Sequence, residues 1–508
     1  MKKALAVLTA AVTAALTGTM CVSAAEYDRY GKEPEEPAPV CGDLNGDNTV
    51  DSFDLCLLRS RIGSSDKSAD INGDGTVDEY DLKTLSDFLL SAGETDSYSP
   101  VGSVRYTDSR TKIAADNAVT GDIITPQMKF STDLLKKTFN NDPDAKEKNL
   151  LISPLSVNVA LGMTANGAAG ETLTEYMDVL GGGMELAGYN DCMADMIARL
   201  TSSEDAVVDI ADSLWFRQQD GLRFSLKQPF LSSTAKYFGA DAFGAPFDDR
   251  TVKDINKWVS HGTHGVIKEL FSDRSNIDDS MMVLINTLYF NGKWLAPYER
   301  AIPSDFTNYD GSKSKADFLY SNERYYITGE GYTGFRKDYK GGQFSFVGIL
   351  PDKESDIYEF VQGIDPAELR SSVMGAADIY ASGDGTTLET SMPKLDYKND
   401  MELKNYLKEM GLANAMSSDA DYSGMTADMP LFVDEVIHKT AIELNETGTV
   451  AAAVTAVSMK NGASMPVNAI RVDLDRPYVY MIMDNETGLP LFIGAVTELK
   501  GTQSEAEQ

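Results

Sequence analysis

Two twelve-residue stretches near the N-terminus carry oxygen-bearing side chains at the same loop positions. One covers residues 43–54, and the other covers residues 70–81 after an offset of 27 residues. Side-chain oxygens at positions 1, 3, 5, 9 and 12, with a backbone carbonyl from position 7, can wrap a hard cation. The spacing therefore predicts two Ca2+ sites. The candidate ligands are Asp43, Asn45, Asp47, Thr49, Asp51 and Asp54 in the first loop, and Asp70, Asn72, Asp74, Thr76, Asp78 and Asp81 in the second.

The remaining loop positions also suit cation binding. Position 6 must turn sharply, and it is Asn48 in one loop and Gly75 in the other, two residue types that tolerate positive φ. Position 8 is an apolar residue, Val50 or Val77, and position 12 is Asp, which still supplies a carboxylate. The alternative is two acidic turns that bind nothing, and two full matches at a fixed offset argue against it.

An apolar helix pattern follows each loop, whereas a Pro- and Glu-rich segment precedes the first. A duplicated loop–helix without a leading helix resembles the dockerin family, and the resemblance covers residues 41–93. It implies a small all-α module that binds a cohesin domain of a scaffolding protein. The residues that it implies for cohesin contact are Ser52, Phe53, Glu79, Tyr80, Arg59 and Arg61. For Phe53 and Tyr80, packing within the module is the alternative.

The rest of the chain carries no assembled catalytic signature. It has no GxSxG, no HExxH and no Walker loop, and the whole sequence has only three histidines. His261 and His264 lack a carboxylate at metal-ligand spacing, so we interpret them as solvated turn residues. A Ser-His-Asp triad is hard to assemble from this inventory, whereas counting alone does not exclude paired carboxylates.

One segment near the C-terminus is unusual. After a β-like run over 433–444, residues 449–458 have no charge and no large side chain. The alanines favour a helix, but at period two Thr449, Ala451, Ala453, Thr455 and Val457 form one face of small to medium side chains. A strand with that face could slip between two others over a packed core.

This segment and four other motifs resemble the serpin family. The motifs are residues 445–453, 153–156, 286–294, 392–394 and the strands within 476–496. The match covers about 125–498 in the family's order. It implies an α+β fold with three β-sheets, eight or nine helices and an exposed reactive loop. It also implies a suicide mechanism, in which a protease cuts the loop and the loop then inserts into the main sheet as a new strand.

The resemblance also implies roles for single residues. The hinge is Glu446, Gly448, Thr449, Ala451, Ala452 and Ala453; the shutter and breach are Ser153, Ser156, Asn286, His438 and Trp294. For His438, the alternative is an ordinary core histidine. In this family the shutter histidine is itself a core residue, so the two interpretations coincide. The candidates at the scissile bond are Gly462, Ala463, Ser464 and Lys460: either Gly462–Ala463 or Ala463–Ser464 suits a subtilisin-like or elastase-like protease, and Lys460 suits a trypsin-like one.

Composition and the N-terminal residues limit the possible ligands and the location of the protein. The chain has 508 residues and a formal net charge of -33, from 78 acidic and 45 basic residues, which argues against nucleic-acid binding. A basic start, an apolar stretch and small residues before position 25 predict an export signal, and no later stretch approaches the ~20 apolar residues of a membrane span. We therefore expect a secreted protein without a membrane span. Lipidation at Cys21 is the alternative, but residues 18–20 before it fit a lipidation signal poorly. Cys41 and Cys56 could pair, or remain thiols like Cys192.

These observations combine into one organisation. We expect a signal peptide over 1–24, a linker over 25–40, the dockerin over 41–93, a linker over 94–124, the serpin domain over 125–500 and a tail over 501–508. The main hypothesis is an inhibitor of serine-type proteases, not an enzyme, that is monomeric in its serpin part and attached to a cohesin-bearing scaffold such as a cellulosome. Alternatives are a non-inhibitory serpin-fold binding module and a scaffold-borne enzyme. The target protease and the cohesin stay open.

Overall fold

The computed structural model describes residues 103–107, 121–141, 149–218, 224–278, 280–433, 436–449 and 468–499, together with Leu58, Arg61, Ala69 and Val77. The chain divides into two compact units, Met1–Ser99 and Pro100–Gln508. The second unit holds three sheets and, within the described residues, nine α-helices. The fold class predicted from the sequence is thereby confirmed.

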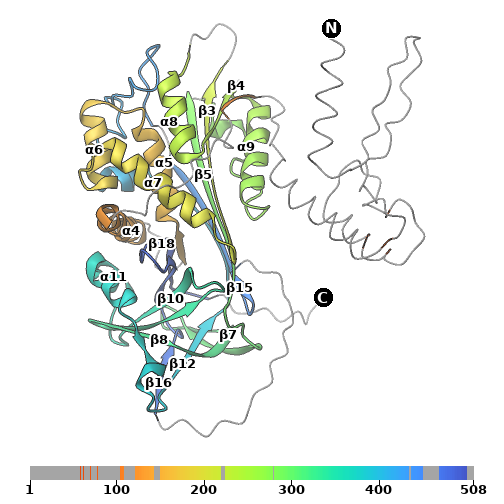
Figure 1. Cartoon of the computed structure of the whole chain (residues 1–508), viewed down its shortest axis with the longest axis vertical. Coiled ribbons are helices and arrows are strands. Elements are labelled where there is room, and N and C mark those ends of the chain that lie inside the picture. The colour runs from red at the N-terminus through yellow and green to blue at the C-terminus, as the bar shows by residue number, and fades with distance from the viewer. Residues whose placement is uncertain are drawn as a thin grey trace. The chain divides into compact units, whose positions relative to one another are not determined.

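A seven-stranded sheet, called the main sheet below, spans much of the second unit (Figure 1). Its two longest strands pair antiparallel without interruption, from Ala206 opposite Gly292 to Phe216 opposite Met282. The strands, in spatial order, are β1 (Val104–Thr107), β4 (Asp241–Ala245), β3 (Ala206–Arg217), β5 (Met282–Lys293), β15 (Gly448–Thr449), β14 (Ile437–Leu444) and β13 (Leu395–Glu402).

The second seven-stranded sheet holds the centre of the core. Every residue of its strands β10, β17 and β18 is buried, because these strands are almost uninterrupted runs of apolar side chains. In spatial order the strands are β11 (Ala377–Asp378), β8 (Tyr325–Gly329), β9 (Tyr332–Asp338), β10 (Phe344–Pro351), β17 (Tyr478–Asp484), β18 (Pro490–Val496) and β2 (Leu150–Ile152). The four-stranded third sheet contains β16 (Ala469–Asp473), β12 (Thr387–Pro393), β7 (Lys313–Glu323) and β6 (Ala301–Thr307).

Helices cover these sheets on several sides (Figure 1). They are α4 (Gly121–Asn141), α5 (Pro154–Ala165), α6 (Gly170–Gly181), α7 (Leu186–Thr201), α8 (Gln228–Phe238), α9 (Asp249–Gly262), α10 (Ile357–Gly363), α11 (Pro366–Met374) and α12 (Lys404–Glu409). A search for bilayer-spanning segments among the described residues returns no helix of sufficient length and apolarity.

Two of these helices position the site. Helix α5 is buried on nearly all sides and contacts both β5 and β18. It starts sharply because Pro154 occupies its first turn and the Ser153 side chain accepts a hydrogen bond from the Ser156 amide. Helix α9 is amphipathic and starts at a capping box between Asp248 and Thr251. It contacts β3 and β5 of the main sheet and buries Trp258.

Candidate insertion site of the main sheet

The main sheet is open at its centre. The two residues of β15 pair with β5 through Gly448 and Thr449, and Thr449 also pairs with Leu444 of β14. Beyond β15, no ladder joins β5 to β14, although both strands are described along their whole length. We call the space between β5 and β14 the slot.

Two cavities, a smaller and a larger one, lie along the slot. The smaller one starts at Thr449 and has Ile482 and Phe492 of the second sheet among its lining residues. The larger one follows residues 282–287 of β5 and reaches Ile437 of β14. Both are lined mainly by apolar side chains, so the slot offers an apolar environment together with the facing edges of two strands.

Thr449, the last described residue before the gap at 450–467, already lies inside the sheet. Its side chain is 2% exposed, and its hydroxyl lies 2.6 Å from the phenol oxygen of Tyr339, which is fully buried. Burial raises the pKa of Tyr339, so the phenol stays protonated at neutral pH. The Thr449 side chain therefore faces the core, in a strand rather than a helix.

The pairing of β15 defines a register for any continuation of that strand. Because side chains alternate along a strand, residues 451, 453 and 455 would face the core as Thr449 does. At the same register Ala451 would lie between Phe290 and Ile442, Ala453 between Leu288 and Thr440, and Thr455 between Asn286 and His438. The small side chain of Ala451 would thus meet the large side chains of Phe290 and Ile442.

Four of the candidate residues come together beneath the slot. The Ser153 amide donates to Nε2 of His438 at 3.0 Å, and the Ser156 hydroxyl bonds Oδ1 of Asn286. Asn286 Nδ2 in turn donates to Asp212 at 2.6 Å. Burial lowers the pKa of His438 to about 4, so its ring is neutral at physiological pH and Nε2 is available as an acceptor. The cluster links α5 to both strands that flank the slot.

The entrance to the slot is fixed by the segment that follows β5. The Trp294 indole donates to the Asn445 carbonyl at 2.9 Å, and the Trp294 amide donates to the Thr447 carbonyl at 2.9 Å. The Tyr298 amide donates to the Glu446 carbonyl, also at 2.9 Å. These bonds hold the turn that leads into β15, so the chain enters the slot from a fixed position.

Several residues near this entrance were assigned no role from the sequence. Lys337 of β9 is 2% exposed and bonds Glu323 at 2.7 Å, with its ammonium 4.3 Å from the centre of the Tyr298 ring. Lys394 lies 3.1 Å from the Glu446 carboxylate. A lysine at an inward position of a strand is an available signal for Lys337, but its acidic partner lies on another sheet and only the fold brings them together.

Other candidates lie outside the described residues. These are the twelve calcium ligands, the hinge positions Ala451, Ala452 and Ala453, the reactive-bond candidates Lys460, Gly462, Ala463 and Ser464, the cysteines Cys41 and Cys56, and the cohesin-contact candidates except Arg61. Arg61 is a half-buried helical residue and Val77 is 6% exposed. His261 and His264 are exposed, as expected, but the fold brings His264 within 2.5 Å of the Asp209 carboxylate.

Comparison with known proteins agrees with this geometry. The family model "Serpin (serine protease inhibitor)" matches residues 125–499, and the model "Dockerin type I domain" matches residues 41–90. The curated protein "Serpin-Z2A" of Triticum aestivum is 30% identical over 380 residues, which cover 71% of this chain and 93% of that protein. A "Serine protease inhibitor" of Cyanea capillata is 29% identical over 357 residues, which cover 69% of this chain and 92% of that protein.

Solved structures give the same result. The thermophilic serpin tengpin in its native state matches with a TM-score of 0.69 and 34% identity, over 78% of this chain and 100% of that one. Tengpin in its latent state matches with a TM-score of 0.64 and 32% identity, over 76% of this chain and 100% of that one. The chain belongs to the serpin family and carries a type I dockerin domain ahead of the serpin fold. Serpins generally inhibit serine proteases, and some members do not.

Proposed function

We propose that the protein is a secreted suicide-substrate inhibitor of serine-type endopeptidases, attached to a cohesin-bearing scaffold through its dockerin. The observation that carries the proposal is β15. Thr449 is already paired with both β5 and β14 within the main sheet, and Gly448 with β5, at the end of an apolar slot. A loop that starts there and continues with small side chains is built to enter the slot after it is cut.

The target protease supplies the chemistry of the first step. Its serine oxygen attacks the carbonyl carbon of the scissile bond, the C–N bond breaks, and the proton of the serine passes through the protease's base to the leaving amine. The N-terminal part of the loop is then held to the protease as an ester. Hydrolysis of that ester releases a cut, inactive loop, so insertion must be faster than attack by water.

The driving force for insertion resides in this chain. Insertion gives hydrogen-bond partners to the facing edges of β5 and β14, and it buries the apolar walls of the slot. Ala451 and Ala453 add little bulk where Phe290 and Leu288 already occupy the space. The uncut protein is thus held in a state of higher free energy than its most stable state. Cutting the loop releases the constraint that holds it there.

The protease class follows from the loop sequence. Small residues at Gly462–Ala463 or Ala463–Ser464 suit subtilisin-like or elastase-like enzymes, whose primary pockets accept small side chains. Lys460 suits a trypsin-like enzyme but requires a shorter loop. We propose Gly462–Ala463 as the main site of cleavage.

The dockerin supplies the attachment. Its two loops provide only carboxylate, amide and carbonyl oxygens, the donors that Ca2+ prefers, and the described Val77 is buried as a position-8 residue should be. Bound Ca2+ would order the loops and present their residues at positions 10 and 11, Ser52, Phe53, Glu79 and Tyr80, to a cohesin. The module thereby brings the inhibitor to a scaffold outside the cell.

The test is direct. The protein is mixed with subtilisin, an elastase and trypsin, denatured adducts are separated on a gel, and the released C-terminal peptide is identified by mass spectrometry. We expect a denaturant-resistant adduct with subtilisin or the elastase and a peptide that begins at Ala463. Protease inactivated at its serine is the control and should give no adduct. Clean loop cleavage without adduct for all three enzymes would favour the non-inhibitory binding module.

A further inference from the structure

Helix α9 and the segment that leads from it to β5 lie on the outer face of the main sheet (Figure 1). We call residues 249–280 the cover and its residues 263–267, directly after the helix, the strap. The outer face is identified by Gly262, whose close neighbours are the outward-facing Thr287 and Ala211. The strap also lines the smaller cavity of the slot, through Thr263, Val266 and Ile267.

Two contacts tie the strap to opposite sides of the slot. On one side, Nε2 of His264 lies 2.5 Å from the carboxylate of Asp209 on β3, and its ring lies 4.4 Å from the ring of Tyr289 on β5. On the other side, the Lys398 ammonium of β13 donates to the carbonyl of Val266 at 3.1 Å. The strap therefore connects β3 and β5 to β13 across the opening.

Both contacts fall on the same row of the sheet. Asp209 pairs with Tyr289, and Lys398 pairs with Ala441. The register of β15 assigns position 452 to the same row, between Tyr289 and Ala441. The strap is thus attached at both ends of the one row that Ala452 must enter, three residues beyond Thr449.

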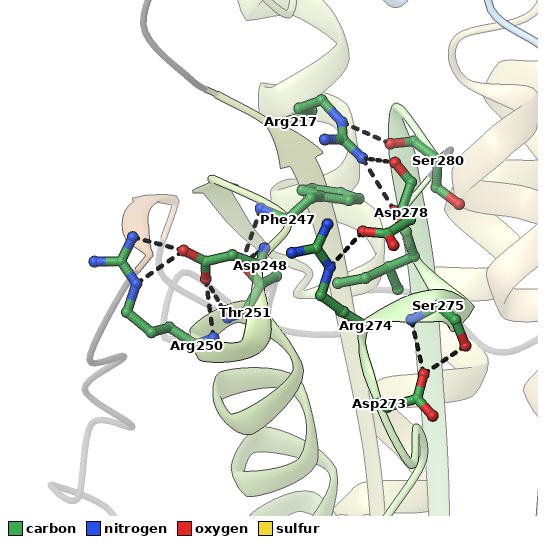
Figure 2. A network of polar contacts seen from close by, with 11 residues as sticks. Arg217, Phe247, Asp248, Arg250, Thr251, Asp273, Arg274, Ser275, Asp278 and Ser280 are labelled. Carbon is green, nitrogen blue, oxygen red and sulfur yellow. Dashed lines mark hydrogen bonds and ion pairs between the residues drawn. The ribbon is translucent and has the colours of Figure 1, made fainter.

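The far end of the cover is fixed more firmly (Figure 2). Arg217, at the end of β3, donates from Nε to the Ser280 carbonyl at 3.0 Å and from Nη2 to the Asp278 carbonyl at 2.6 Å. Its guanidinium also lies 4.7 Å from the centre of the Phe247 ring, just before α9. One side chain therefore contacts the residues next to both ends of the cover. The strap is anchored to α9 by the buried Thr263, which donates to the Val259 carbonyl at 2.8 Å, but its contacts with β3 and β13 are exposed.

The exposure of the two strap contacts suits release. The His264 and Asp209 side chains are 51% and 46% exposed, and Lys398 is exposed as well. Exposed polar contacts of this kind are weak and break readily. Resting on the proposed function, we propose that the His264–Asp209 and Lys398–Val266 contacts form a latch that keeps the strap closed over the slot and sets the rate at which the loop passes position 452.

The test opens the latch without touching the loop or the slot. His264→Asn removes the ring but keeps a residue that tolerates the observed φ of 50°, and Lys398→Met removes the donor but keeps the length of the side chain. The matched control combines His261→Asn, on the exposed last turn of α9, with Lys315→Met on the four-stranded sheet. Hydrogen exchange of the uncut protein is followed in residues 284–291 and 437–444.

We expect each latch variant to speed exchange in these strands about two- to fivefold and the double variant to exceed either one, because each weak contact contributes at most about a factor of five. The control should match the parent protein, and all variants should keep the parent's near-ultraviolet circular dichroism. Unchanged exchange in the folded double variant would overturn the latch.

This measurement needs no protease, so it separates the two proposals. Absence of any protease adduct would remove the inhibitory function and leave the exchange result valid. With a protease that does form the adduct, the double latch variant should form it at a higher limiting rate. The fold increase in that rate should be about the same as the fold increase in hydrogen exchange. An adduct rate that stays at the parent value while exchange rises would also overturn the assignment of the latch to loop insertion.

Discussion

Replacing Thr449 with arginine is the sharpest test of insertion. Thr449 is 2% exposed, faces Tyr339, and lies between β5 and β14. The variant Thr449→Arg loses the hydrogen bond to Tyr339, worth about 1 kcal/mol. It also buries a guanidinium without a counterion, which costs about 3–5 kcal/mol. Together these costs raise the free energy of every state in which residue 449 lies inside the sheet by about 4–6 kcal/mol.

The expected consequence is a change from inhibitor to substrate. Because residue 449 already lies inside the sheet of the uncut protein, the variant should first displace β15 from the slot. If half of that cost then returns in the transition state of insertion, the loop enters about fiftyfold more slowly or worse. Water then has time to hydrolyse the acyl-enzyme, so the protease emerges active. The loop should be cut at the same bond as in the parent protein, because position 449 is far from the scissile bond in sequence.

The assay is the number of inhibitor molecules consumed for each protease molecule inactivated, together with adduct yield on a gel. We expect that number to rise at least tenfold for Thr449→Arg. Val450→Arg is the matched control, because alternation turns position 450 to the outer face, where a charge stays in water. A normal adduct yield from Thr449→Arg would refute insertion with the Thr449 face toward the core. An equal loss of adduct in both variants would indicate an effect of the added charge alone.

Three further predictions concern other parts of the chain. Chelation of calcium should abolish binding to a cohesin in a pull-down and leave adduct formation unchanged, and loss of both would mean that the two domains are coupled. Because burial lowers the pKa of His438 from 6.5 to about 4, the unfolded state takes up more protons between these values. The free energy of unfolding should therefore fall by up to about 3 kcal/mol as pH drops from 6.5 to 4, and His438→Gln, compared by denaturant unfolding, should lack this contribution; parallel pH profiles would contradict the argument. Lys337→Met should lower the midpoint of thermal unfolding by leaving Glu323 buried without its cation, a cost of about 3 kcal/mol, whereas adding Glu323→Gln should restore most of the loss; equal midpoints for the single and double variants would show that the pair is not coupled.

Much of the fold could be predicted from sequence because its motifs are local. The hinge segment, the small-residue face after Thr449 and the strand-rich C-terminus are each contiguous in the chain. The structure adds that β15 is already paired on both sides, which no local pattern reveals. For Thr449 itself, period two rather than alanine content identifies the structure, because cross-strand pairing outweighs helix propensity.

The contacts that the sequence could not reveal join distant segments. Tyr339 and Thr449 are 110 residues apart, and Lys394 and Glu446 are 52 apart. The row that joins Asp209 to Lys398 depends on three strand registers, and each register is decided by packing of whole faces rather than by neighbours in the chain. His264 shows the same limit, because its carboxylate partner lies on another element.

The two residues of β15 also change the kinetic character of insertion. In any chain that zips into ordered structure, the first contacts are the unfavourable ones, since they fix backbone without yet gaining neighbouring hydrogen bonds. Here that nucleus exists before a protease arrives. Cutting the loop then starts a propagation, row by row, in which the early rows can still reverse and the later ones commit. Whether the protease is trapped or released depends on how fast this propagation is relative to hydrolysis of the acyl-enzyme. The resting sheet already supplies the first row of the inserted strand.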